Sequence, residues 1–479
     1  MAAPLRLIRT HWAVSIVLAL GVALRAGVAI AYRPAIFFGD SWAYLDLAYN
    51  GTPVGLAPDR PSGYPLLIDI ISIAGRSLAA ITTVQHLAGL IAGLLVYALL
   101  NKLGLPRLIA AVGAAIVLLD GYTIALEQQI MAESFFALAL IASMYLAIGK
   151  SRGPWALAAS GLLLAAAATI RTVALFAIPV WIGYLFLAHG RSRAVAAALV
   201  SMLVPLIAYS GIYAANTGHF GLGQADGWFL YGRVGQFADC GDAKVPADTR
   251  ALCLRTERDR QEGAAFHVWN ADGPARRVFG GMSRDPQEQA RSNDALRSFA
   301  VAIIRDRPLR YARAVASDFL RYFNPGEMSR GNSDLALTLP EEGRIVRRNE
   351  LVRDRYFPNY EPQVYEPAAF MRGYQNRLHT PRWLMAILAL AGLLSLAATA
   401  IGRRRTPMVH SRETFLLIGA ALAMLLGSAA TSEFVLRYLI PAVPLIVCGG
   451  FAACTDIVAL VRSRERARFS VRRALHARA

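Results

Sequence analysis

One stretch near the start of the chain combines a carboxylate, a cation and turn-forming prolines. Residues 38–44 read FGDSWAY and residues 60–65 read RPSGYP, soon after the first long apolar run. A carboxylate such as that of Asp40 can accept a proton, and a guanidinium such as that of Arg60 can bind an anion. A loop that only joined two helices would seldom carry so many polar and conformation-fixing residues. We therefore expect chemistry in this loop, just outside a membrane.

The composition is that of a polytopic membrane protein. Of the 479 residues, 56% are hydrophobic, and apolar runs long enough to cross a hydrocarbon core recur along the chain. The net charge of +18 does not indicate nucleic-acid binding, because residues 216–380 are nearly balanced, with 24 basic and 21 acidic residues. The surplus belongs to the membrane part, where it lies mostly in short loops on one side, as the positive-inside rule predicts for cytoplasmic loops.

Hydropathy predicts about ten membrane-spanning helices, with both termini in the cytoplasm. Every inner loop is then basic, and the carboxyl-terminal tail after Val461 is basic as well. The basic residues of the inner loops are Arg6, Arg9, Lys102, Arg107, Lys150, Arg152, Arg191, Arg193, Arg403, Arg404, Arg405 and Arg412. The predicted spans are residues 12–32, 79–100, 108–122, 133–149, 154–170, 173–188, 194–214, 383–401, 413–430 and 438–460.

The predicted architecture is an all-α polytopic membrane protein in three parts. Residues 1–215 form an amino-terminal transmembrane module with its first outer loop at residues 33–78. Residues 216–380 form an extracytoplasmic domain of mixed α/β or irregular structure. Residues 381–479 form the last transmembrane helices and the basic cytoplasmic tail.

The extracytoplasmic segment carries two further signals. Residues 295–323 have the apolar spacing of an amphipathic helix that lies against the membrane. Cys240 and Cys253 lie in the same segment, where an exported compartment permits a disulfide between them. Two free thiols are the alternative.

Several short motifs resemble one family of membrane enzymes. They include DSWAY at residues 40–44, RPSGYP at residues 60–65, MAE at residues 131–133 and RYLIP at residues 437–441. Their order and placement resemble those of the phospholipid-carrier-dependent glycosyltransferases of the GT-C fold, a superfamily that also holds the protein O-mannosyltransferases and the lipid A aminoarabinose transferase. The resemblance implies an inverting hexosyl- or pentosyltransferase. Its donor would be a polyprenyl-phosphate sugar, used on the outer side of the cytoplasmic (inner) membrane.

Such a reaction needs a base that faces the acceptor. The acceptor hydroxyl loses its proton as it attacks the anomeric carbon, so a carboxylate must stand at the membrane surface. Asp40 is best placed for this role, and the resemblance favours it as the catalytic residue. The alternative is that Asp40 caps the helix that follows it, because Asp is a favoured N-cap residue.

The departing polyprenyl phosphate gains negative charge, which preorganised cations stabilise. Arg60, Arg171 and Arg437 are each predicted at the outer boundary of the membrane, where a lipid phosphate would lie. The alternative for each is an arginine that reaches the interface from a helix end. Arg60 has the further alternative of pairing with Asp59 or Asp46.

Other polar side chains are candidates for substrate binding. Glu133 would assist donor binding or orient an arginine, or it would stabilise the start of its own helix. His86 would line the cavity, or it would form a buried hydrogen-bonded pair. A divalent cation could neutralise the phosphate, but these carboxylates do not define a ligand set by their spacing, so metal use stays open. The substrate-binding candidates are Ser41, Tyr44, Asp46, Tyr64, Glu133 and His86.

Two other classes of membrane protein fit part of the pattern. A transporter or flippase for lipid-linked sugars would place more polar groups near the bilayer midplane, whereas the charged residues here crowd one face. An O-antigen polymerase or ligase would use a lipid-diphosphate donor with the same charges. The position of the Asp40 loop directly after the first helix favours the transferase. Its acceptor would be a glycan, a glycolipid or a protein hydroxyl.

Overall fold

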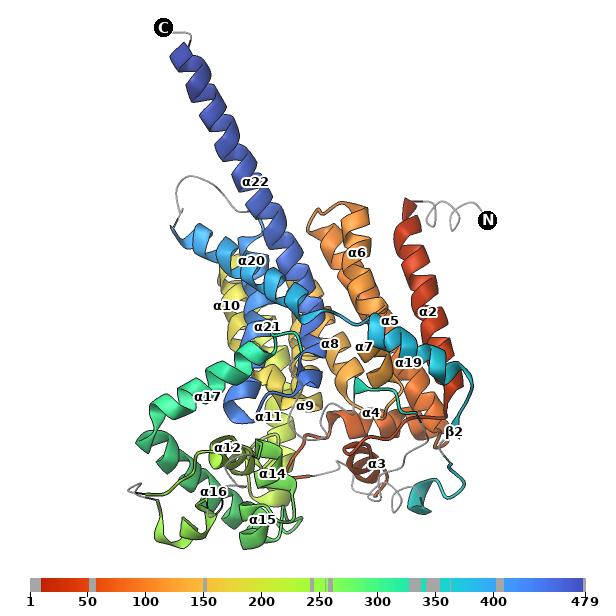
Figure 1. The fold of residues 1–479 in the computed structure, drawn as a ribbon, viewed down its shortest axis with the longest axis vertical. Coiled ribbons are helices and arrows are strands. Elements are labelled where there is room, and N and C mark those ends of the chain that lie inside the picture. Colours follow the sequence, from red (N-terminus) through yellow and green to blue (C-terminus); the bar gives the residue numbers. More distant parts are fainter. Residues whose placement is uncertain are drawn as a thin grey trace.

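The computed structural model consists of a bundle of long apolar helices with a group of shorter helices against one end (Figure 1). The start of α2 (Trp12–Ala31) and the far end of α22 (Val443–His476) lie at one end of the bundle. α3 (Ser41–Tyr49) and α12 (Asp226–Gly235) lie at the other, which we call the cap end. The structure describes residues 10–50, 57–149, 153–241, 245–254, 256, 262–326, 337–341, 354–361, 363–401 and 409–476.

The chain is a multi-pass membrane protein, as predicted. Within the described residues, seven helical stretches are long and apolar enough to cross a membrane, and a bent pair makes an eighth. α8 (Glu133–Ala147) and α9 (Pro154–Ile170) account for the other two predicted spans, as apolar helices of 15 and 17 residues. The seven stretches are α2, α5 (Leu78–Lys102), η2 (Thr172–Phe176) with α10 (Ile178–His189), α11 (Arg193–Thr217), α20 (Arg382–Ile401), α21 (Ser411–Thr431) and Leu436–Ser463. The last stretch includes η5 (Leu436–Tyr438), η6 (Ile440–Ala442) and the start of α22.

The bent pair is α6 (Arg107–Leu118) and α7 (Gly121–Glu127), whose axes differ by 51°. Backbone groups freed by such a break must find partners inside the protein, because lipid offers none. The segment after α19 (Pro367–Arg377) supplies one: the Gly121 amide donates to the Leu378 carbonyl at 2.9 Å. The same segment also binds the side chain at the break, since the Thr380 amide donates to Asp120 Oδ1 at 2.5 Å. A distant part of the chain therefore forms hydrogen bonds with both residues at the break, Asp120 and Gly121.

A helical cap with a core of its own covers one end of the bundle. We define the cap as the described residues between Asp226 and Arg321. Trp228, Tyr231 and Phe299 are among its fully buried side chains. Besides α12, its elements are η3 (Ala247–Leu252), α14 (Ala264–Trp269), α15 (Pro274–Phe279), α16 (Pro286–Asp306) and α17 (Pro308–Arg321).

The described part of residues 216–380 is mainly helical, whereas the sequence predicted mixed α/β or irregular structure. Its only strand among the described residues is β2 (Gln363–Val364), which pairs antiparallel with β1 (Tyr32–Arg33). The sequence carries a simple signal of these helices, because α15, α16, α17 and α19 each begin with proline. Proline is favoured at the first position of a helix, where its missing N–H is not needed.

The predicted single amphipathic helix over residues 295–323 is wrong, because two helices occupy this range. α16 ends at Asp306 and α17 begins at Pro308, with Arg307 between them outside the helical region (φ −130°, ψ 55°). Proline lacks an amide hydrogen and disfavours a helical conformation of the residue before it, so a helix that reaches Pro308 ends there.

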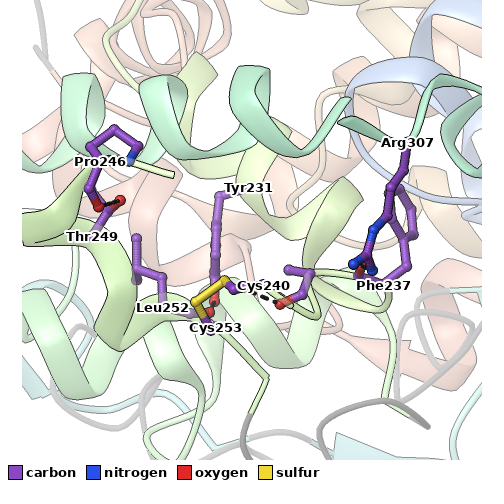
Figure 2. Close-up of a disulfide and its surroundings, with 9 residues drawn as sticks. Tyr231, Phe237, Cys240, Pro246, Thr249, Leu252, Cys253 and Arg307 are labelled. Carbon is purple, nitrogen blue, oxygen red and sulfur yellow. Dashed lines mark hydrogen bonds between the residues drawn. A yellow bond between two sulfur atoms is a disulfide. The ribbon is translucent and has the colours of Figure 1, made fainter. Parts of the chain in front are cut away.

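Cys240 and Cys253 form a disulfide, which decides between the two alternatives left by the sequence (Figure 2). The bond closes a loop with a sequence separation of 13 beside the buried ring of Tyr231, whose hydroxyl donates to the Leu252 carbonyl at 3.1 Å. The disulfide thus ties the segment after α12 to the residue that follows η3, beside the cap core.

Removing this disulfide is expected to destabilise the cap. A loop of this size should contribute about 3 kcal/mol to the free energy of unfolding. We expect the double variant Cys240→Ser, Cys253→Ser to unfold at a lower temperature than the wild type in detergent. A reductant should lower the melting temperature of the wild type and leave that of the variant unchanged; equal sensitivity of both proteins would contradict this role.

Candidate functional site

Asp40 lies in the turn between β1 and α3, and its carboxylate faces two guanidinium groups. Oδ2 of Asp40 is 2.8 Å from Nη2 of Arg437, and Oδ1 is 3.6 Å from Nη2 of Arg60. The backbone of Asp40 directly precedes α3, yet its side chain makes no capping hydrogen bond. The alternative that this carboxylate caps α3 therefore does not apply. Instead, Oγ of Ser41 accepts a hydrogen bond from the Phe38 amide at 2.9 Å and closes the turn.

Arg171 and Arg437 lie together because Glu133 stands between them. Glu133 begins α8 and is only 2% exposed. Its Oε1 accepts a hydrogen bond from Nη1 of Arg171 and lies 4.0 Å from Nε of Arg437. Glu133 thus orients two arginines, as one of its predicted roles requires. Arg60, from the first loop, completes a cluster of three guanidinium groups beside Asp40.

Aromatic rings hold each of these guanidinium groups. Arg60 lies 5.0 Å from the ring centroid of Tyr44, and Arg171 lies 4.9 Å from that of Tyr438. Arg437 lies 5.5 Å from the centroids of Phe38 and Tyr438. Such a contact adds a cation–π attraction and restricts the orientation of the guanidinium.

Tyr44, in turn, is supported by Tyr64, with ring centroids 4.8 Å apart and nearly perpendicular planes. The buried Tyr64 hydroxyl donates to Oε1 of Gln85 at 2.5 Å. Tyr64 is therefore one layer behind the cluster, whereas Tyr44 touches it. Phe38 and Tyr438 belong to the motifs FGDSWAY and RYLIP, but their types and spacing did not predict that they would contact Arg437.

Several buried polar atoms of the cluster have no hydrogen-bond partner among the described residues. They are Nη1 of Arg60, Nε and Nη1 of Arg437, and Oε2 of Glu133. Buried polar groups in proteins are nearly always paired, so these nitrogen atoms are available donors in a place where donors are rarely left alone. Arginine N–H groups match the oxygen atoms of a phosphate in number and geometry. Arg437 offers the most.

Arg60 has a second partner as well. Its Nε donates to Oδ2 of Asp59 at 2.9 Å, so the predicted alternative of a pair with Asp59 also holds. Three arginines and three carboxylates, those of Asp40, Asp59 and Glu133, thus meet in one cluster.

The neighbouring cations control the ionisation of Asp40. Burial raises the pKa of its carboxyl group, but the guanidinium groups of Arg437 and Arg60 outweigh this effect and lower the pKa to about 2. Asp40 is therefore ionised throughout the physiological range. It is a weak base while Arg437 contacts it, and an anion that took over the N–H groups of Arg437 would raise its pKa.

The lowered pKa predicts how Asp40 contributes to stability as pH changes. Because the folded-state pKa of about 2 lies below the ordinary value of 3.8, the folded form binds fewer protons, and the contribution is complete above the ordinary pKa. We expect the difference in melting temperature between the wild type and Asp40→Asn to stay constant above about pH 5 and to shrink as pH falls towards 2. A difference that grew on acidification would contradict the ion pairs described here.

Asp46 and His86 lie outside the cluster. Asp46 accepts hydrogen bonds from Nη2 of Arg284 at 2.5 Å and from the Tyr356 hydroxyl at 3.1 Å, so it ties α3 to later segments of the chain. His86 has Nδ1 2.8 Å from Oε2 of Glu127, within the bundle. It forms the buried hydrogen-bonded pair that was its alternative.

Arg25, in the middle of α2, completes this second buried group. Its Nε lies 2.7 Å from Oε2 of Glu127, and its Nη1 donates to the Leu118 carbonyl at 2.8 Å. Arg25 thereby joins α2 to both halves of the bent pair, α6 and α7.

For metals, the described residues contain no group of three or more His, Cys, Asp or Glu side chains that could hold an ion.

Residues 62–214 match the family model of dolichyl-phosphate-mannose-protein mannosyltransferases. The predicted resemblance is confirmed over this part of the chain. The matched region contains Tyr64, His86, Glu133 and Arg171, whereas Asp40 and Arg437 lie outside it. None of the curated proteins matches the chain.

Two solved structures are similar to this chain at low sequence identity. The oligosaccharyltransferase AglB from Archaeoglobus fulgidus, solved with an inhibitory peptide and a dolichol-phosphate, is 14% identical with a TM-score of 0.41. That similarity covers 96% of this chain and 52% of AglB, so the chain spans about half the length of AglB. ArnT from Cupriavidus metallidurans, solved with undecaprenyl phosphate, is 15% identical with a TM-score of 0.36, over 92% of this chain and 78% of ArnT.

Proposed function

We propose that this protein is an inverting glycosyltransferase that moves a sugar from a polyprenyl-phosphate donor to an acceptor hydroxyl at the outer face of the cytoplasmic membrane. The observation that carries the proposal is the contact of the Asp40 carboxylate with Arg437, whose Nε and Nη1 are buried without hydrogen-bond partners among the described residues. The family match over residues 62–214 supports a lipid-carrier donor. The acceptor would be a glycan, a glycolipid or a protein hydroxyl.

In this proposal Asp40 is the general base. It takes the proton of the acceptor hydroxyl as the acceptor oxygen bonds to the anomeric carbon of the sugar. The bond from that carbon to the phosphate oxygen breaks at the same time, and its electron pair leaves with the phosphate. Arg437, Arg171 and Arg60 stabilise the charge that develops there. Because attack and departure occur on opposite faces of the sugar, the anomeric configuration inverts.

The contact between Asp40 and Arg437 must then open during the reaction. Oδ2 of Asp40 and Nη2 of Arg437 are 2.8 Å apart. In the reaction the sugar lies between the base and the leaving phosphate, so Asp40 and the arginine that binds this phosphate must move apart. We infer that the donor enters between them and that its phosphate takes over the N–H groups of Arg437. The pKa of Asp40 then rises, so the carboxylate becomes a stronger base when the donor is in place.

The position of the cluster in the bundle fits a lipid-borne donor. Asp40, Arg60 and Arg437 lie at the cap end, beyond or near the ends of long apolar helices, where lipid head groups are expected. The opposite end carries basic loop residues such as Lys102 and Arg193, which by the positive-inside rule would face the cytoplasm. Other residues of the predicted basic loops, namely Arg6, Arg9, Lys150, Arg152, Arg403, Arg404 and Arg405, lie outside the described residues.

A transfer assay tests the proposal. Purified protein in lipid nanodiscs is supplied with a panel of polyprenyl-phosphate hexoses and pentoses and with acceptors of the three classes. We expect the protein to transfer the sugar from a monophosphate donor. The product should have the inverted anomeric configuration, which NMR determines. A product with retained configuration would contradict the mechanism. Tighter binding of undecaprenyl diphosphate than of undecaprenyl phosphate would contradict the donor class and favour a polymerase or ligase.

A further inference from the structure

The loop that directly precedes η5 and Arg437 is held mainly by the cap. This loop, residues 432–435, joins α21 to η5. Both carboxylate oxygens of Glu433 accept hydrogen bonds from the cap, from the amides of Ala264 and Ala265 at 3.0 Å each. These amides lie at the start of α14, where a helix has unpaired N–H groups that favour a negative partner. Glu433 therefore fastens the loop to α14.

A buried ion pair of the cap holds the same loop at two further points. Arg233 of α12, only 1% exposed, donates to Oδ2 of Asp318 of α17. The same oxygen accepts a hydrogen bond from the Phe434 amide at 3.2 Å, and Nη1 of Arg233 donates to the Ser432 carbonyl at 3.3 Å. An ion pair this deeply buried needs good geometry and extra hydrogen bonds to offset its desolvation, and the loop backbone supplies them.

Packing adds to these polar contacts. The Phe434 ring meets the Tyr322 ring edge-on with centroids 4.9 Å apart, and the guanidinium of Arg321 lies 4.7 Å from the Phe434 ring centroid. Phe434 and Tyr322 are both buried. The loop is thus enclosed by α14, α12 and the end of α17, and little freedom remains for the residues that follow.

Arg437 follows these anchors closely. From Phe434 the chain reaches it through Val435 and Leu436, and the Tyr438 amide donates to the Val435 carbonyl at 2.9 Å in a tight turn. Because this connection is short, we expect a shift of Phe434 to move Arg437 as well. The guanidinium of Arg437, which follows this connection, contacts the carboxylate of Asp40.

We propose that the cap positions Arg437 for the donor phosphate, with Glu433 as the main positioning residue and with Asp318 and Phe434 in support. This inference rests on the proposed function, because it assigns a task only if Arg437 binds the phosphate. It gives the cap a role in donor binding, in addition to any contact with an acceptor.

The test measures the affinity of the full-length protein for undecaprenyl phosphate in nanodiscs. Glu433→Gln keeps the size of the side chain but removes the charge and places an amide group against two N–H donors. We expect it to weaken binding about 10- to 100-fold, the scale on which a displacement of about 1 Å affects a positioned group. Phe434→Leu, which keeps an apolar side chain and the backbone amide, should weaken binding in the same direction and serves if Glu433→Gln fails to fold.

The matched control is Asp226→Asn, which breaks an ion pair with Arg297 at the cap surface, away from the loop. It should leave the affinity unchanged even where it lowers the melting temperature, so a general loosening of the cap is distinguished from a shift of the loop. An equal loss of affinity in this control would overturn the positioning role.

A double-mutant cycle separates this inference from the proposed function. If Glu433 acts through Arg437, Glu433→Gln should have no further effect on binding in the Arg437→Ala background, because residues that act on one contact are not additive. Additive losses, or a Glu433→Gln variant with wild-type affinity, would overturn the positioning role alone. Wild-type affinity of Arg437→Ala would instead overturn the phosphate role of Arg437 in the proposed function.

Discussion

Replacing Asp40 by asparagine is expected to lower the rate of sugar transfer about 1000-fold, within the range of about 10²- to 10⁴-fold that a positioned general base supplies. The amide has nearly the same size and still accepts a hydrogen bond, but it cannot take the acceptor proton. The affinity for undecaprenyl phosphate should be unchanged or higher, because the carboxylate that competes with the phosphate for Arg437, at 2.8 Å, is replaced by a neutral amide. Transfer rates and donor affinities of the purified variant test both halves of this expectation.

The control for this variant is another carboxylate of the same loop. Asp69, on α4 (Gly63–Ile71), is exposed, and Asp69→Asn should leave the transfer rate within about twofold of the wild type, as is usual for surface substitutions. Unchanged turnover of Asp40→Asn would remove Asp40 from the mechanism. Loss of donor binding together with turnover would show that its charge mainly holds the arginines in place.

Replacing Arg437 by alanine is expected to weaken the binding of undecaprenyl phosphate about 100-fold, since removal of one partner of a desolvated, hydrogen-bonded charge pair costs about 2–5 kcal/mol. Among the described residues of the cluster, Arg437 has the largest number of buried nitrogen atoms without a hydrogen-bond partner. Arg437→Lys should recover part of the loss, because lysine keeps the charge but lacks the planar fork that binds two phosphate oxygens. Titration with undecaprenyl phosphate measures all three proteins.

The Arg437→Ala variant also has a matched control and a second readout. Arg284 pairs with Asp46 at the surface with an exposed side chain, so Arg284→Ala should keep the donor affinity of the wild type. In Arg437→Ala the pKa of Asp40 should move up towards its ordinary value, because the cation that lowers it most is gone. An unaltered affinity in Arg437→Ala would exclude this residue from the phosphate site.

The sequence by itself determined the helices of the bundle and the loop where chemistry was expected. Apolar runs are a local property, since a helix long enough to cross lipid must carry its own hydrophobic residues. The turn at Arg171, between α9 and η2, could be predicted from charge as well, because one bent span there would place the basic residues 403–405 on the outer side. The order of motifs along the chain also pointed to the family that residues 62–214 match.

Only the tertiary structure decided which side chains share the site. Asp40 and Arg437 lie near opposite ends of the sequence, and their contact depends on how the first loop and the last span pack together. Asp46, six residues after Asp40, turns to Arg284 instead, while His86 turns inwards to Glu127. The spacing of residues along the chain does not predict either of these contacts, because the packing of distant segments brings each partner into place. The same holds for Glu433, whose partners are two amides at the start of a cap helix.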